Sequence, residues 1–372
     1  MKVLRAKTKD LLQTRPLDII QQRNSKLNIE ELEIQKTILS SYPRRIVLEL
    51  TSSCNLNCIM CGRDNPNFIK TFLDISILKE LEVFLKYAEE VTLFGWGEPT
   101  VHPKFSEFLR VLYNYNVRKY FVTNGMLLNK FIDDIFRYKV DIIAVSLDGA
   151  TPQTNNRIRV RSDFKKIIDN ASLIQNKKKY LGVSYPYMNL VFTAMRSNIE
   201  ELPQMVYLTK ELGLEELKVV YLTVFNENLI SENLHGEKEL VRRYFEKAIE
   251  IADNLKIKIK LPHYQGEDEA GELSHKPCYA GWRDLFIGSD GSIRPCQSTS
   301  YIINRFDKNA DFKEIWNSKE FRDFRSRVND TDKMPEQCRL CYQSSYANWN
   351  KKESFIQINT DFAPEWKKTP NK

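Results

Sequence analysis

Short apolar runs alternate with amphipathic segments through the middle of this 372-residue chain. Six runs have the composition of buried strands, at residues 45–51, 91–94, 120–123, 141–147, 188–195 and 217–222. Helical periodicity separates them, at residues 74–90, 105–115, 128–138, 164–175 and 199–212. Because repeated strand–helix units give parallel strands covered by helices, the sequence predicts an α/β fold built on a partial (β/α)6, TIM-like barrel.

The rest of the chain lacks this rhythm, and we divide it into flanking segments. Residues 1–43 are expected to form a helical extension ahead of a barrel at 44–225. Residues 226–275 are expected to be a linker containing one helix and one strand, followed by a small module at 276–345 and a tail at 346–372. In folds of this kind, chemistry collects in the loops that follow the carboxyl ends of the strands.

The net charge of +7 comes from the two ends of the chain. Residues 1–45 hold ten Lys and Arg against five Asp and Glu, and residues 346–372 hold five against three. The neutral middle argues against a nucleic-acid partner. No apolar run approaches the length of a membrane span, and the charged N-terminus lacks a secretory signal. The sequence therefore predicts a cytoplasmic protein without a membrane partner.

Seven cysteines fall into an early and a late group, and in a reducing cytosol such clusters favour metal ligands over disulfides. Cys54, Cys58 and Cys61 form a C-x3-C-x2-C pattern in the loop after the first strand. Three thiolates need a fourth ligand to complete a zinc site, which leaves a zinc knuckle as the alternative. They can also hold three irons of a 4Fe–4S cluster and leave the fourth iron open to a ligand with adjacent amino and carboxylate groups.

Three more strand ends carry motifs that fit such a ligand. A Gly-Trp-Gly-Glu-Pro segment follows the second strand, Asn-Gly follows the third, and a serine ends the fourth. Together with the cysteine loop, this pattern resembles the radical S-adenosylmethionine (radical SAM) superfamily. The resemblance implies cofactor contacts from these motifs, at Gly95, Gly97, Glu98, Pro99, Asn124 and Ser146.

The resemblance also implies the chemistry. In this superfamily the cluster passes one electron to S-adenosylmethionine, and cleavage yields a 5′-deoxyadenosyl radical that abstracts hydrogen from a substrate. A low-potential donor such as flavodoxin or ferredoxin supplies the electron. Arg159 is the expected partner of the methionine carboxylate, with Arg157 and Arg161 as competitors, because a guanidinium suits that geometry.

The late group comprises Cys278, Cys296, Cys338 and Cys341. An Asp-Gly pair at 290–291 predicts a hairpin that brings Cys278 and Cys296 toward one end, and a helix is expected at 312–328. Four thiolates fit either zinc or a fully ligated 4Fe–4S cluster. The arrangement resembles the twitch module, a shortened SPASM domain, which implies one auxiliary 4Fe–4S cluster.

The cysteine count bears on the substrate. If all seven cysteines are ligands, none is left to return a hydrogen atom, and the auxiliary cluster is available as an electron acceptor. The chain is also similar to the butirosin aminocyclitol dehydrogenase, so the first hypothesis is a radical SAM oxidoreductase acting on a small, sugar-like alcohol. The alternative is a ribosomal-peptide maturase or a radical epimerase. The short segment ahead of the barrel leaves little room for the leader-binding domain that many maturases carry.

Overall fold

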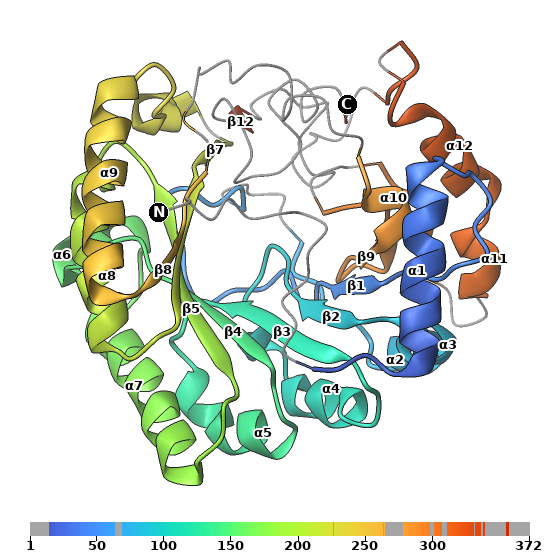
Figure 1. The fold of residues 1–372 in the computed structure, drawn as a ribbon, viewed down its shortest axis with the longest axis horizontal. Helices are drawn as coiled ribbons and strands as arrows, with labels where there is room; N and C mark the ends of the chain where they lie inside the picture. Colours follow the sequence, from blue (N-terminus) through green and yellow to red (C-terminus); the bar gives the residue numbers. More distant parts are fainter. Residues whose placement is uncertain are drawn as a thin grey trace.

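The computed structural model describes residues 15–63, 69–225, 227–262, 264, 278–297, 301–306, 311–330, 332–335, 338 and 355–356. Its centre is a ten-stranded sheet of order β11-β10-β9-β1-β2-β3-β4-β5-β6-β8. Figure 1 shows this sheet curving around the middle of the molecule, with the helices on its outer side. The α/β, partial-barrel prediction is therefore confirmed. Among the described helices, none is both long enough and apolar enough to cross a bilayer.

The six predicted strands form the parallel core of the sheet. They are β1 (Arg45–Leu48), β2 (Glu90–Leu93), β3 (Arg118–Thr123), β4 (Ile142–Ser146), β5 (Tyr187–Ala194) and β6 (Glu216–Tyr221). The strand expected within the linker, β8 (Lys258–Lys260), pairs in parallel with β6. The segment at 226–275 thus supplies an edge strand of the sheet in addition to connecting two parts of the chain.

Helices between the strands bury their apolar faces against the outer side of the sheet. They are α2 (Ile77–Glu80), α3 (Glu82–Tyr87), α4 (Phe105–Leu112), α5 (Ile132–Arg137), α6 (Pro152–Ile158), α7 (Phe164–Leu181), α8 (Leu202–Glu211) and α9 (Lys238–Leu255). Short 3-10 turns precede some of them: η1 (Pro99–Val101), η2 (Leu128–Phe131), η3 (Ile199–Glu201) and η4 (Glu227–Glu232). The helix expected at 74–90 is broken, because Leu81 leaves the helical region with ψ near 1°.

The C-terminal module extends the same sheet. Strands β9 (Asp284–Ile287) and β10 (Ser292–Arg294) form the predicted antiparallel hairpin, whose turn uses Gly291 at φ +78°. Strand β9 pairs in parallel with β1, and β11 (Asn304–Arg305) pairs with β10. Helix α10 (Ala280–Arg283) precedes the hairpin. The single helix expected at 312–328 is two helices, α11 (Phe312–Trp316) and α12 (Lys319–Arg327), because Ser318 caps the second.

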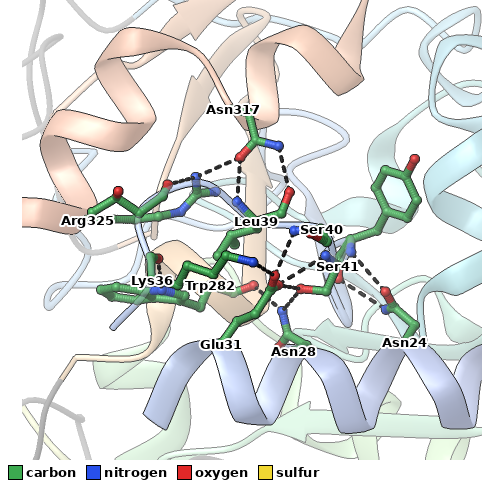
Figure 2. Close-up of polar contacts among 12 residues, drawn as sticks. Asn24, Asn28, Glu31, Lys36, Leu39, Ser40, Ser41, Trp282, Asn317 and Arg325 are labelled. Atoms are coloured by element: carbon green, nitrogen blue, oxygen red, sulfur yellow. Dashed lines mark hydrogen bonds and ion pairs between the residues drawn. The ribbon is translucent and has the colours of Figure 1, made fainter. Parts of the chain in front are cut away.

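Helix α1 (Ile19–Glu33) lies against this module and has a polar buried face. The buried side chains are Gln21, Asn24, Ser25, Asn28 and Glu31. Asn28 Nδ2 donates to the Trp282 carbonyl oxygen at 2.9 Å. Figure 2 shows the Glu31 carboxylate accepting hydrogen bonds from the loop that follows the helix. Hydrogen bonds, rather than an apolar stripe, therefore dock α1.

A buried arginine completes this docking. Arg325 of α12 donates to the carbonyl oxygens of Gly281 (2.8 Å), Thr37 (3.0 Å) and Trp316 (2.7 Å). Its guanidinium also lies 4.6 Å from the centre of the Trp316 ring. Asn317 exchanges two hydrogen bonds with the backbone of Leu39, as Figure 2 shows. These hydrogen bonds thus join the segment after α1 to Asn317 and α12, which lie far from it in the sequence.

The remaining described strands form a small separate ladder. Strand β7 (Thr223–Val224) follows β6, and β12 (Phe355–Ile356) pairs with it in parallel. Two residues of the expected C-terminal tail therefore add to a strand that leaves the barrel.

Candidate functional site

The early cysteines lie on one loop after β1, where Cys54, Cys58 and Cys61 are half-buried free thiols. Backbone hydrogen bonds fix the middle of this loop. Asn57 N donates to Val160 O and Ile59 N donates to Ile158 O, both at 2.9 Å. Cys58 is therefore held beside the segment that follows α6.

Polar hydrogens surround two of the three sulfurs. Arg63 Nε donates to Cys61 Sγ at 3.4 Å, and the backbone N–H of Leu56 donates to Cys54 Sγ at 3.4 Å. Asn124 Nδ2 lies 3.7 Å from the same Cys54 sulfur. Donors of this kind stabilise thiolates and tune the potential of an iron–sulfur cluster. Arg63 was missed at the sequence level, although a guanidinium two residues after the last cysteine was a usable signal.

This donor set fits a cluster better than a single ion. Among the described residues, no three Cys, His, Asp or Glu side chains are gathered for one metal ion. In a 4Fe–4S cluster each thiolate binds a different iron, so the sulfurs do not need to meet at one point. Burial raises the pKa of the Cys58 thiol to about 12, and nearby Arg159 opposes the shift. Iron binding would remove that proton.

The two glycines after β2 allow two loops to touch. A Cβ at Gly97 would lie 2.2 Å from the carbonyl oxygen of Thr51, and a Cβ at Gly95 would lie 2.5 Å from Glu49 Oε1. The next residue, Glu98, donates its N–H to Ser53 O at 2.9 Å. The glycines are therefore required by contact between the second loop and the cysteine loop. Their predicted contacts with a cofactor stay predictions.

Glu98 faces the protein interior. Its buried carboxylate accepts hydrogen bonds from Thr100 Oγ1 (2.6 Å), Thr123 Oγ1 (2.7 Å) and the N–H groups of Asn124 (2.6 Å) and Thr100 (3.2 Å). Burial raises the pKa of Glu98, and these donors oppose the shift. Pro99 follows as the first residue of η1 and is also buried. Glu98 thus acts as a positioning residue that joins the ends of β2 and β3.

Asn124 is the predicted residue that reaches the cysteine loop. Its Nδ2 donates to Asn55 Oδ1 at 2.8 Å, and its Oδ1 accepts from Met126 N at 3.0 Å. Ser146 ends β4 and is half-buried. The structure therefore places both residues at the carboxyl edge of neighbouring strands, and their contacts with a cofactor stay predictions.

Arg159 is already paired. Its guanidinium lies 2.7 Å from Asp148 Oδ2, and both side chains are buried. Its competitor Arg157 donates to the Ser197 carbonyl at the surface, and Arg161 occupies a left-handed turn at φ +72°. The charge of Arg159 acts on Cys58 in the cysteine loop, but its guanidinium is paired with Asp148. Its binding of a ligand carboxylate stays a prediction.

An aromatic pair adjoins the cysteine loop. The rings of Trp96 and Phe225 are 5.4 Å apart, edge to face. A Cβ at Gly62 would lie 2.9 Å from the Trp96 ring, so the indole packs directly on the residue after Cys61. Neither aromatic was predicted as a site residue, since isolated aromatics are more often core residues.

The late cysteines come from three separate elements. Cys278 precedes α10, Cys296 follows β10 and Cys338 follows α12, and all three are half-buried free thiols. Asn329 Oδ1 accepts from Cys278 N at 2.6 Å, and Asn329 Nδ2 donates to Cys278 O at 3.1 Å. The first and third elements are therefore joined through Asn329. The fourth predicted ligand, Cys341, lies outside the described residues.

Comparison with known proteins gives two family matches. The radical SAM superfamily model matches residues 48–190, and the SPASM iron–sulfur cluster-binding domain model matches residues 278–342. The AdoMet-dependent heme synthase of Methanosarcina barkeri is 25% identical over 327 residues, covering 82% of this chain and 89% of that protein. The PqqA peptide cyclase of Gluconobacter oxydans is 27% identical over 319 residues, covering 82% and 84%.

Solved structures agree on the fold. Streptococcus suis SuiB bound to its precursor peptide SuiA aligns with a TM-score of 0.61 at 15% identity, covering 83% of this chain and 71% of SuiB. The same enzyme bound to S-adenosylmethionine aligns with a TM-score of 0.63, covering 83% and 72%.

Proposed function

Since the chain belongs to the radical SAM superfamily and carries a C-terminal SPASM domain, we propose that it is a radical SAM enzyme that modifies a peptide. The two domains indicate 4Fe–4S clusters and S-adenosylmethionine as its cofactors. The observation that carries the proposal is the three-thiol loop at the carboxyl ends of the strands, with N–H donors directed at its sulfurs.

In this proposal Cys54, Cys58 and Cys61 hold the cluster that binds S-adenosylmethionine. When bound, that cluster supplies the electron that cleaves the cofactor into methionine and the 5′-deoxyadenosyl radical. The protein's own residues prepare the site. Arg63 and Asn124 hold the loop and its sulfurs, and the Trp96 ring packs against Gly62.

The late cysteines hold the second cluster in this proposal. Cys278, Cys296 and Cys338 are its described ligands, and Cys341 is the fourth. Four-thiolate ligation leaves no iron open to substrate, so this cluster takes up an electron instead. With all seven cysteines in use, the net reaction is a two-electron oxidation of the substrate.

A peptide substrate is supported by the relatives. One is named as a peptide cyclase, and SuiB was solved with a precursor peptide. This evidence favours the peptide alternative over our first hypothesis of a sugar-like alcohol. The heme synthase shows that a related sequence also serves a non-peptide product.

The test is a matched screen of the reconstituted, reduced protein with S-adenosylmethionine. One arm contains synthetic peptides that tile the short reading frames beside its gene, and the other contains polyols and aminocyclitols. We expect one peptide to stimulate 5′-deoxyadenosine formation and to lose about 2 Da, the mass of two hydrogens. Oxidation of a polyol with no response from any peptide would overturn the peptide assignment and leave the radical SAM assignment intact.

A further inference from the structure

The inner face of the curved sheet carries a group of lysines at its β6–β8 edge. Side chains alternate along a strand, so Leu217 and Val219 of β6 are buried under the helices while Lys218 faces inward and is half-buried. Lys258 and Lys260 lie on the same face of β8, as their ion pairs with Glu216 show.

These lysines outnumber their carboxylates. Glu216 Oε2 lies 2.9 Å from Lys260 Nζ and 3.4 Å from Lys258 Nζ, and Tyr187 Oη also donates to it, at 3.0 Å. Lys218 makes no hydrogen bond or ion pair with any residue that the structure describes. Two of the three ammonium groups therefore share one carboxylate, and the third has no ion pair among the described residues.

Two other inward cations each contact a carboxylate, although Asp284 also binds Arg283. Arg45 of β1 pairs with Asp284 at 2.6 Å, and Arg118 of β3 pairs with Glu90 at 2.7 Å. A half-buried ammonium without a partner is costly, so a purely structural lysine would normally be paired as these arginines are. The excess positive charge is therefore localised at Lys218 and its neighbour Lys260.

The register places this charge in the same row of the sheet as Ser146, the last residue of β4. Ser146 pairs with Val191, Val191 with Lys218, and Lys218 with Lys260, so all four lie in one row across the sheet. Neighbouring strands are about 4.8 Å apart, so the Lys218 backbone is about 10 Å from that of Ser146. A group bound by the lysines would lie within reach of a substrate positioned above Ser146.

We propose that Lys218 and Lys260 form a subsite for an anionic group of the substrate, a carboxylate or a phosphate. The inference rests on the proposed function, whose substrate it narrows to an anionic molecule. Burial, Lys260 and Arg45 together lower the pKa of Lys218 to about 8, and Glu216 only partly opposes them. An anion bound here would restore the full charge of Lys218 and offset the repulsion between the two lysines.

Lysine acetylation of the wild-type holoenzyme tests the subsite. Acetic anhydride is applied with and without succinate or inorganic phosphate at matched ionic strength, and modified lysines are mapped by mass spectrometry. At about ten times the dissociation constant, an anion leaves about a tenth of the sites free, so acetylation of Lys218 should slow about tenfold. Lys165, an exposed residue of α7, is the internal control.

Each outcome decides the proposal. Protection of Lys218 by succinate alone identifies a carboxylate site, by phosphate alone a phosphate site, and by both a general anion site. Equal acetylation of Lys218 in all three conditions overturns the proposal. As a second measurement, the protecting anion should raise Tm in wild type and Lys165→Gln and fail to do so in Lys218→Gln and Lys260→Gln. Formation of 5′-deoxyadenosine by the wild type separately tests the proposed function.

Discussion

The two cysteine groups are positioned in different ways. The early group sits on one loop, fixed by backbone hydrogen bonds to residues 158–160 and by side chains at the ends of neighbouring strands. The late group is spread over three elements that meet through long-range contacts, such as that between Cys278 and Asn329. The first site thus depends on local loop geometry, whereas the second depends on how distant segments dock.

The N-terminal segment contacts the C-terminal module, which carries the late cysteines. Asn28 contacts Trp282, Thr37 contacts α12, and Leu39 contacts the end of α11. Changes in this polar contact should therefore disturb the late cysteines and spare the early loop. Changes at the strand ends should have the opposite effect.

Removing either cysteine group is the strongest way to separate the two sites. Anaerobically reconstituted wild type should bind about eight irons, which is two 4Fe–4S clusters. A triple Cys54/Cys58/Cys61→Ala variant and a Cys278/Cys296/Cys338→Ala variant should each keep about four irons. Iron analysis and electron paramagnetic resonance check this. Zinc in the wild type with only four irons would contradict the two-cluster account.

Arg325→Met should weaken the docked region. The change leaves two buried carbonyl oxygens and a partly buried one without this donor, and each buried unsatisfied group costs about 1–3 kcal/mol. We expect the free energy of unfolding to fall by about 3–5 kcal/mol and the late cluster to be lost first. Arg322→Met, on the exposed side of the same helix, is the matched control. Loss of both clusters in equal measure would mean that the sites are not independently supported.

Glu98→Gln should affect the early site instead. An amide keeps one acceptor oxygen where the carboxylate serves four donors, so the end of β3 and Asn124 lose part of their support. We expect a loss of about 1–3 kcal/mol in unfolding free energy and a slower cleavage of S-adenosylmethionine, with the late cluster intact. Cleavage at the wild-type rate would remove Glu98 from its positioning role.

The smallest expected effect is a pH dependence at α1. Burial alone would raise the pKa of Glu31, but hydrogen bonds from Lys36, Ser41 and Ser40 outweigh it and hold the pKa below its usual value. The carboxylate therefore stabilises the fold above its unfolded pKa of about 4.3, and this contribution is lost as the pH falls through the lower, folded value.

Glu31→Gln should accordingly lower the free energy of unfolding at pH 7 by about 1–2 kcal/mol. The difference from wild type should shrink as the pH falls below about 4. Urea unfolding at pH 7 and at low pH measures it, with the exposed Glu33→Gln as control. A difference that does not change with pH would show that the charge of Glu31 contributes nothing.

Much of the barrel was predictable because its signals are local. Apolar runs and helical spacing located every parallel strand of the core, and cysteine spacing located the candidate cluster loop. The partner of a strand is not a local property. Nothing in Asp284–Ile287 indicates pairing with β1, which lies 239 residues earlier at Arg45.

The structural roles of individual residues were also not predictable from the sequence. Gly97 and Glu98 were recognised from their motif, but their roles depend on Ser53, Thr51 and Thr123, which a sequence does not place beside them. The polar buried face of α1 follows no hydrophobic periodicity and so gave no helical signal of burial. The excess positive charge around Lys218 does not show in the net charge of the middle of the chain, because carboxylates elsewhere balance it. It becomes visible only when β6 and β8 are paired in register.

The formation of 5′-deoxyadenosine tests the central claim most directly. Dithionite-reduced, reconstituted protein is incubated with S-adenosylmethionine, and wild type is compared with Cys58→Ala and Cys338→Ala. The account predicts slow cleavage by the wild type, none above background by Cys58→Ala, and continued cleavage by Cys338→Ala. Undiminished 5′-deoxyadenosine from Cys58→Ala would contradict the assignment of the early cysteine loop as the active centre.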